Sequence, residues 1–127
     1  MVREIVDALH QRSLEEHGGQ DGLRNENGLE SALAQPMHMF AYGQGDMFDL
    51  AAAYAYHIAE NQPFIDGNKR TAITTALAFL EFNEIATSAI TNAELYDAMI
   101  AIAEKRLDKA GLAEIFRRNL AAGGESL

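Results

Sequence analysis

The chain has 127 residues, of which 48% are hydrophobic, 19 are acidic and 10 are basic, giving a formal net charge of -9. This length and composition fit one domain spanning residues 1–127, and they exclude a largely disordered chain and nucleic-acid binding through a broad basic face. The absence of cysteine from the sequence excludes a disulfide framework and a thiolate nucleophile or metal site.

The sequence shows no apolar run of about 18 residues and no basic start followed by an apolar stretch. A membrane span and a signal peptide are therefore not expected, and the predicted location is the cytoplasm. The acidic balance favours a basic protein partner over direct contact with nucleic acid. The tail, residues 121–127, is expected to fray.

Apolar residues at three- and four-residue spacing predict a first core-packing helix over about 2–14. A polar, glycine-rich loop follows. Residues 28–35 predict a short helix that Pro36 ends, because proline lacks a backbone N–H and clashes inside a helix. Residues 37–45 leave two interpretations open: a small hairpin or flap that docks a substrate, or a surface loop whose aromatic side chains tuck into the core.

Two apolar helices are predicted near the middle of the chain. Asp46 is a candidate N-cap for a helix over 47–60, which is apolar nearly all round, as expected for a helix inside a bundle. A second core helix is predicted over 68–82. The connector between these two helices is therefore expected to lie where they pack together.

The last third of the chain predicts two further helices. Residues 85–90 interrupt the helical periodicity and have some strand character. Thr91 and Glu94 match a capping box, so a helix is predicted over 92–105. A final helix is expected over 112–120. The predicted fold class is therefore all-α, with about six helices in one domain.

The connector over residues 61–71 reads Asn-Gln-Pro-Phe-Ile-Asp-Gly-Asn-Lys-Arg-Thr. A glycine-bearing loop that runs into a helix start leaves free backbone N–H groups, which form an anion site together with the helix dipole. Asp66 suits a divalent cation, because Mg2+ is usually bound through one or two carboxylates plus phosphate oxygens. Lys69 and Arg70 suit phosphate as a point charge and as a fork. The connector is therefore predicted to bind a metal-loaded polyphosphate.

Each residue of this connector also has a simpler interpretation. Asp66 alone would more often be a capping residue, and Arg70 alone would more often be a surface or ion-pair cation. Asn68 is a candidate N-cap as well as a phosphate ligand, and Pro63 is interpreted as structural. The joint spacing of the carboxylate and the two cations favours the binding site over a loop that merely caps a helix.

Residues 62–70, Gln-Pro-Phe-Ile-Asp-Gly-Asn-Lys-Arg, resemble the Fic/Doc family signature His-x-Phe-x-(Asp/Glu)-(Gly/Ala)-Asn-(Gly/Lys)-Arg at every position but the first. Similarity to the Doc branch of this family covers nearly the whole chain. It extends to Leu9-His10, the Gly18-Gly19 turn, the segment 28–36 and the helix 71–81.

The resemblance implies a role for each matched residue. Phe64 would anchor the loop in the core, and Asp66 would hold Mg2+. Contacts to the phosphates of ATP would come from Gly67, Asn68, Lys69 and Arg70. The catalytic set would comprise Asp66, Lys69 and the residue at position 62.

Two positions make the chain resemble Doc more than the AMP-transferring Fic enzymes. Those enzymes usually carry glycine at the position of Lys69 and a second arginine at the position of Ile73. The Doc resemblance implies a toxin that transfers a phosphoryl group from ATP to a hydroxyl of elongation factor Tu. It also implies restraint by a Phd-like antitoxin, in keeping with the lack of a Ser/Thr-x-x-x-Glu-(Gly/Asn) inhibitory motif in the sequence.

Gln62 departs from the family, in which this position is the histidine that takes the proton from the target hydroxyl. A glutamine amide has no useful basicity near neutral pH, and loss of a positioned general base costs about 10²- to 10⁴-fold in rate. The loop is therefore expected to bind nucleotide and to transfer poorly. The four histidines lie outside the motif, and His57, on the preceding helix, is a weak candidate for a substitute.

Three functions compete on these observations. The first is a Doc-type toxin whose activity is lost or reduced. The second is a Fic-type AMP transferase, which Lys69 and Ile73 disfavour. The third is a catalytically dead module that binds an antitoxin or another protein, which Gln62 and the acidic balance favour. Gln62 itself fits an introduced substitution, a degenerate copy or a natural variant with altered chemistry.

Overall fold

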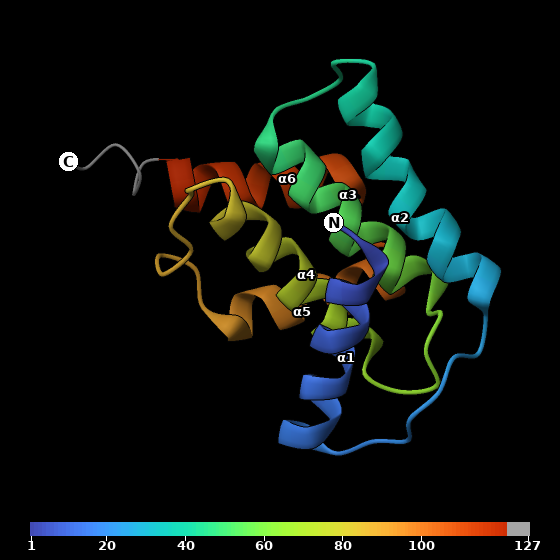
Figure 1. The fold of residues 1–127 in the computed structure, drawn as a ribbon. Helices are drawn as coiled ribbons and strands as arrows, with labels where there is room; N and C mark the ends of the chain where they lie inside the picture. The colour runs from blue at the N-terminus through green and yellow to red at the C-terminus, as the bar shows by residue number, and fades with distance from the viewer. Residues whose placement is uncertain (122–127) are drawn as a thin grey trace.

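The computed structural model describes residues 1–121, so the expected fraying of the tail from residue 122 onward lies outside the described residues. Six α-helices and a short π-helical turn make up the fold (Figure 1). They are α1 Arg3–His17, α2 Glu26–Ala41, α3 Met47–Asn61, α4 Asn68–Phe82, α5 Asn92–Ala103, α6 Lys109–Phe116 and the turn η1 Arg117–Ala121. Within residues 1–121 the strand-like pairing is one isolated antiparallel bridge between Leu23 and Phe64. The all-α prediction is confirmed.

The helix α3 occupies the middle of the bundle and contacts α2, α4, α5 and α6 (Figure 1). Its run from Leu50 to Ala55 is entirely buried. Alanine side chains are small and so permit neighbouring helices to pack closely. The prediction of a helix that is apolar nearly all round, placed inside the bundle, is therefore confirmed.

One cluster of buried side chains joins all six helices. Each helix contributes at least one of its fully or almost fully buried members, namely Val6, Leu29, Ile58, Leu80, Met99 and Phe116. The helix α4 packs against both α3 and α1. The loop between α3 and α4 therefore lies where the first helix of the chain meets the two central helices.

The prediction that Pro36 ends a short helix is wrong. Pro36 is buried inside α2, which begins at Glu26 and continues to Ala41. Proline removes one hydrogen bond, to the carbonyl of Ala32, and an interior proline costs about 3 kcal/mol in a helix. Packing of the buried face of α2 against α3 offsets that cost.

Both interpretations of the segment 37–45 are also wrong, because the first part of this segment is helical. It forms neither a hairpin nor a loop with inward-facing aromatic residues. Phe40 and Tyr42 are 69% and 79% exposed, and the chain turns only at Gly43 to Gly45 before α3 begins.

The strand character expected for 85–90 is not realised, and the segment consists of turns and irregular backbone. Ile90 is 7% exposed and Ile85 packs against the core cluster. Short apolar runs do not distinguish strands from core-anchored turns. The isoleucines here anchor a connection in the core.

The helix starts predicted from the capping side chains of Asp46 and Thr91 are confirmed. Asp46 and Asp49 form a reciprocal capping box at 2.9 Å in both directions, and Thr91 Oγ1 accepts from the N–H of Glu94 at 3.1 Å. The last helix begins earlier than predicted because Asp108 caps it. None of the helices within residues 1–121 is both long enough and apolar enough to cross a membrane.

Candidate functional site

The connector between α3 and α4 is fixed from the inside by an aromatic anchor. Gln62 ends α3 in the left-handed region with φ 45°. Phe64 is 2% exposed, and its ring stacks on the buried ring of His10 at 3.8 Å between centroids with 11° between planes. The expectation that Phe64 lies in the core is confirmed. Its burial fixes the position of the connector relative to α1.

The connector is fixed from the outside by the segment that precedes α2. The carbonyl of Pro63 accepts from the N–H groups of Arg24 at 2.7 Å and Asn25 at 3.0 Å, and the N–H of Ile65 donates to Gly22 at 3.0 Å. This pairing of distant segments produces the isolated bridge in the fold. Nothing in the local sequence pattern identifies it.

Asn68 closes the connector with its side chain. Its Oδ1 accepts from the N–H of Phe64 and its Nδ2 donates to the carbonyl of the same residue, each at 2.9 Å. The N-cap of α4 is Gly67, with φ 82°, and Asn68 is the first helical residue. The N-cap interpretation of Asn68 is therefore wrong: its amide is engaged with Phe64, and its own backbone N–H points out of the helix start.

The first backbone N–H groups of α4 are left free. Within the described residues, the N–H groups of Asn68, Lys69 and Arg70 have no acceptor, and Thr71 is the first to bond back, to the carbonyl of Gly67 at 2.9 Å. Unpaired N–H groups at the positive end of a helix dipole attract anions. The start of α4 thus has the backbone geometry of a phosphate site.

Asp66 stands at the mouth of this site with one carboxylate oxygen committed. Its Oδ2 accepts from the N–H of Gln20 at 2.7 Å, and its carbonyl is 2.8 Å from Nε2 of His10. These contacts leave Oδ1 without a partner in residues 1–121. A single available carboxylate suits Mg2+ carried by phosphate oxygens, and the described residues hold no cluster of three or more His, Cys, Asp or Glu that would bind a metal alone.

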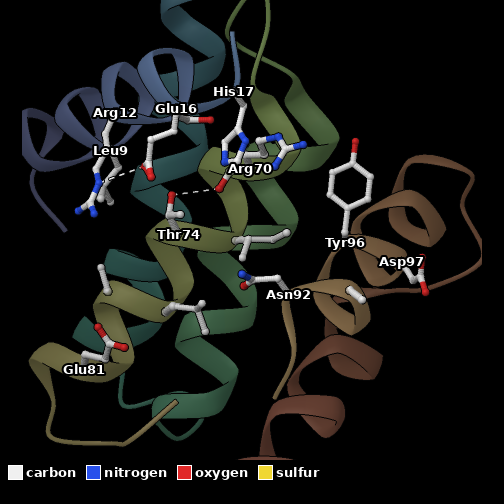
Figure 2. Close-up of a pocket in the computed structure, with 15 residues that line it drawn as sticks. Leu9, Arg12, Glu16, His17, Arg70, Thr74, Glu81, Asn92, Tyr96 and Asp97 are labelled. Atoms are coloured by element: carbon white, nitrogen blue, oxygen red, sulfur yellow. Dashed lines mark hydrogen bonds and ion pairs between the residues drawn. The ribbon is translucent and has the colours of Figure 1, made fainter. Parts of the chain in front are cut away.

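Lys69 and Arg70 form no ion pair with any described carboxylate. The guanidinium carbon of Arg70 lies 5.6 Å from the centre of the Tyr96 ring on α5, a cation–π distance (Figure 2). The two positive charges are therefore available to an anion from outside.

The predicted site residues converge on one cavity of about 420 Å³. Six of them line it: Gln62, Asp66, Gly67, Asn68, Lys69 and Arg70. The sequence did not predict the other contributors, which include His17 at the end of α1 and Tyr96 on α5. The cavity combines one carboxylate, two cations and a helix start, a donor set that suits a magnesium-loaded polyphosphate.

Gln62 lies at the cavity, and Arg24 holds it there. Nη2 of Arg24 donates to the backbone carbonyl of Gln62 at 2.6 Å and lies 3.4 Å from its Oε1. His57 does not line the cavity. It lies on α3 with Nε2 3.4 Å from Nζ of Lys109, and burial, reinforced by this lysine, lowers the pKa of His57 to about 4. The structure therefore gives no support to His57 as a substitute base.

Comparison with known proteins defines the class. The family model described as "Fic/DOC family" matches residues 2–80, a span that contains α1 to α3, the connector and most of α4. The chain belongs to the Fic/DOC family.

Two curated relatives place the chain more closely. It is 30% identical over 116 residues to the "Protein kinase doc" of Escherichia phage P1, covering 91% of this chain and 90% of that protein. It is 36% identical over 75 residues to the "Toxin Doc" of Mycolicibacterium smegmatis strain ATCC 700084 / mc(2)155, covering 57% of each. Both relatives carry the Doc name, in agreement with the resemblance of residues 62–70 to that branch.

Proposed function

We propose that this protein is a Doc-type toxin that binds ATP with Mg2+ and transfers its terminal phosphoryl group to a hydroxyl of elongation factor Tu, and so blocks translation. The observation that carries the proposal is the convergence of Asp66, Lys69, Arg70 and the unpaired N–H groups of α4 on one cavity. The names of the two relatives support the toxin and kinase parts of the proposal.

In this proposal the residues of the cavity position the nucleotide and stabilise the negative charge on its phosphates. Asp66 would hold Mg2+, which supplies charge neutralisation on the phosphates when it is bound. The helix start, Lys69 and Arg70 bind the phosphate oxygens and stabilise the charge that develops as the bond to the leaving group breaks. A bond forms from the hydroxyl oxygen to the terminal phosphorus, the bond from that phosphorus to the oxygen of the leaving ADP breaks, and the hydroxyl proton passes to solvent water.

Gln62 limits that reaction. Its side chain accepts and donates hydrogen bonds, so it orients a hydroxyl at the cavity, but it does not take a proton near neutral pH. We expect transfer about 10²- to 10⁴-fold slower than with a positioned base. The chain as it stands is proposed to bind nucleotide well and to act as a weak or inactive transferase.

Two features favour phosphoryl over AMP transfer. Lys69 lines the cavity where AMP-transferring enzymes carry glycine. Ile73, 7% exposed on α4, stands where they carry a second arginine. Restraint of the toxin is proposed to come from a Phd-like antitoxin, supported by the Doc names of both relatives.

Mass spectrometry of elongation factor Tu tests the proposal. The target is incubated with Mg-ATP and either the chain itself, the Gln62→His variant or the Gln62→His/Asp66→Ala variant. We expect one added phosphoryl group with Gln62→His, little with the chain itself and none when Asp66 is also replaced. Addition of a whole AMP would contradict the proposal and establish the Fic-type alternative. A target left unmodified by Gln62→His would contradict both transferase assignments.

A further inference from the structure

The peptide bond between Asp66 and Gly67 is held from the core side by a buried side chain of α1. Nε2 of His10 lies 2.8 Å from the carbonyl oxygen of Asp66. Because a carbonyl oxygen only accepts, Nε2 carries the proton of this hydrogen bond. His10 is 3% exposed and its ring stacks on Phe64, so the donor itself has a fixed position.

The N–H group of Gly67 lies on the opposite side of the same peptide. The described residues contain no cis peptide bond, and in a planar trans peptide the carbonyl and the N–H point in opposite directions. The carbonyl of Asp66 points toward His10, so the N–H of Gly67 points away from it. Gly67 lines the phosphate cavity, and its N–H has no acceptor within residues 1–121. It adds a fourth free donor to the three at the start of α4.

The backbone alone leaves the orientation of this peptide open. Gly67, with φ 82° and ψ 17°, has the conformation of the third residue of a type II turn. In a type I turn the central peptide is rotated by about 180° and the third residue has a negative φ. Glycine adopts both signs of φ readily. A rotated peptide would turn the carbonyl of Asp66 toward the cavity, where its oxygen would repel a phosphate.

We propose that His10 is a positioning residue of the phosphate site, whose hydrogen bond holds the peptide between Asp66 and Gly67 with its N–H toward the bound polyphosphate. The inference rests on the proposed function, because it concerns the same ligand. His10 does not line the cavity and acts through the peptide. Its side chain makes two separable contributions, the ring that stacks on Phe64 and the Nε2–H that fixes the peptide.

Two substitutions separate these contributions in calorimetric titrations with Mg-ATP. His10→Phe keeps an aromatic ring against Phe64 and removes the donor, whereas His10→Gln removes the ring and keeps an amide N–H on a side chain of similar reach. We expect His10→Phe to weaken Mg-ATP binding about tenfold or more, the effect of losing one hydrogen bond to a charged group. His10→Gln should bind Mg-ATP nearly as tightly as the unmodified chain.

The stability of the two variants should follow the opposite order. His10→Gln loses the aromatic pair and buries an amide in place of the ring, so it should unfold at a lower urea concentration than His10→Phe. A residue with only a structural role would lower the ATP affinity and the urea midpoint together. Unweakened ATP binding by His10→Phe, or affinities that follow the urea midpoints, would overturn the inference.

Nuclear magnetic resonance of the unmodified chain covers the case in which His10→Phe does not fold. On addition of Mg-ATP, the amide resonance of Gly67 should shift to saturation together with those of residues 68–70. A Gly67 amide that stays in place while the others shift would overturn the inference and leave the phosphate site standing. A chain that binds no Mg-ATP would overturn the proposed function itself, and with it this role of His10.

Discussion

Arg70 and Arg117 carry the same charge in opposite surroundings. Both guanidinium groups lie over an aromatic ring, at 5.6 Å from the centre of Tyr96 and 6.0 Å from the centre of Phe48. Arg117 also pairs with three carboxylates at 2.9 to 3.2 Å, which raise its pKa, Asp46 most strongly. Arg70 pairs with none among the described residues.

Arg117 is thus a structural cation, whereas Arg70 is the cation that we propose binds phosphate. Arg117 forms ion pairs with Asp46 and Asp49 at the start of α3 and with Glu114 on α6. Its charge therefore links these two helices. Arg70 stands beside the free N–H groups of α4, where a carboxylate of the protein would compete with a phosphate. Arg24, Lys109 and Arg118 also form no ion pair with a described carboxylate. The position of Arg70 beside the free N–H groups, and not the missing partner alone, is therefore what favours an external anion.

The largest expected effect concerns Phe64, the buried aromatic anchor of the connector between α3 and α4. Phe64→Ala should lower the free energy of unfolding by about 3–5 kcal/mol, because it removes a buried ring and leaves a cavity beside His10. Urea denaturation measures the loss. Phe82→Ala is the control, since Phe82 is 64% exposed, and a comparable loss there would contradict the assignment of Phe64 as the anchor.

The next effect is a difference in ATP affinity between variants of Arg70 and Arg117. Arg70→Ala should weaken Mg-ATP binding about 10- to 100-fold, the range that corresponds to one charged hydrogen bond, while leaving the unfolding free energy nearly unchanged. Arg117→Ala changes the net charge equally and should leave the ATP affinity as it is. Calorimetric titration of both variants measures this. Equal losses of affinity would mean that only the overall charge matters, and the proposed contrast would be wrong.

Arg117→Ala should destabilise the fold more than Arg70→Ala, the reverse of their order in ATP binding. Arg117→Ala should lower the unfolding free energy by about 0.5–1 kcal/mol, because partly exposed ion pairs contribute little in water and three carboxylates lose their partner. Thermal melting of the unliganded variants at low and high salt measures it, and the difference should shrink with added salt. A larger loss for Arg70→Ala than for Arg117→Ala would reverse the assignment of the two roles.

A pH-dependent effect concerns His57, the imidazole on α3. Its pKa is lowered from 6.5 to about 4 in the folded chain, so the unfolded chain binds a proton more readily. Stability from this group is fully present above pH 6.5 and is lost as the pH falls toward 4. His57→Gln should flatten the pH dependence of urea denaturation in that window. An unchanged pH profile would contradict a half-buried neutral imidazole at this position.

The sequence predicted the parts of the fold that depend on local chemistry. The apolar run of α3 and the caps at Asp46 and Thr91 were identified because periodicity and capping act within a few residues. Pro36 was misinterpreted because a local rule predicts a helix end there, whereas packing of α2 on α3 outweighs the lost hydrogen bond. Propensity is a weak prior against tertiary contact.

The candidate site divides in the same way. Asp66, Lys69 and Arg70 were identified from their spacing, and the structure brings them to one cavity. The supports of the connector were not predicted, because the hydrogen bond from Gln20 to Asp66 and the ring of Tyr96 beside Arg70 join residues far apart in the chain. No single-sequence pattern encodes such pairs, and the side chain of Asn68 received the wrong structural role for the same reason.

We propose that the start of α4, with Lys69 and Arg70, binds a magnesium-loaded triphosphate. Calorimetric titration of the unmodified chain with ATP, with and without Mg2+, measures this binding, and Asp66→Ala is titrated in parallel. We expect saturable binding that strengthens with Mg2+, and loss of that strengthening in Asp66→Ala. Absence of binding by the unmodified chain, or binding that responds to neither Mg2+ nor the removal of Asp66, would contradict it.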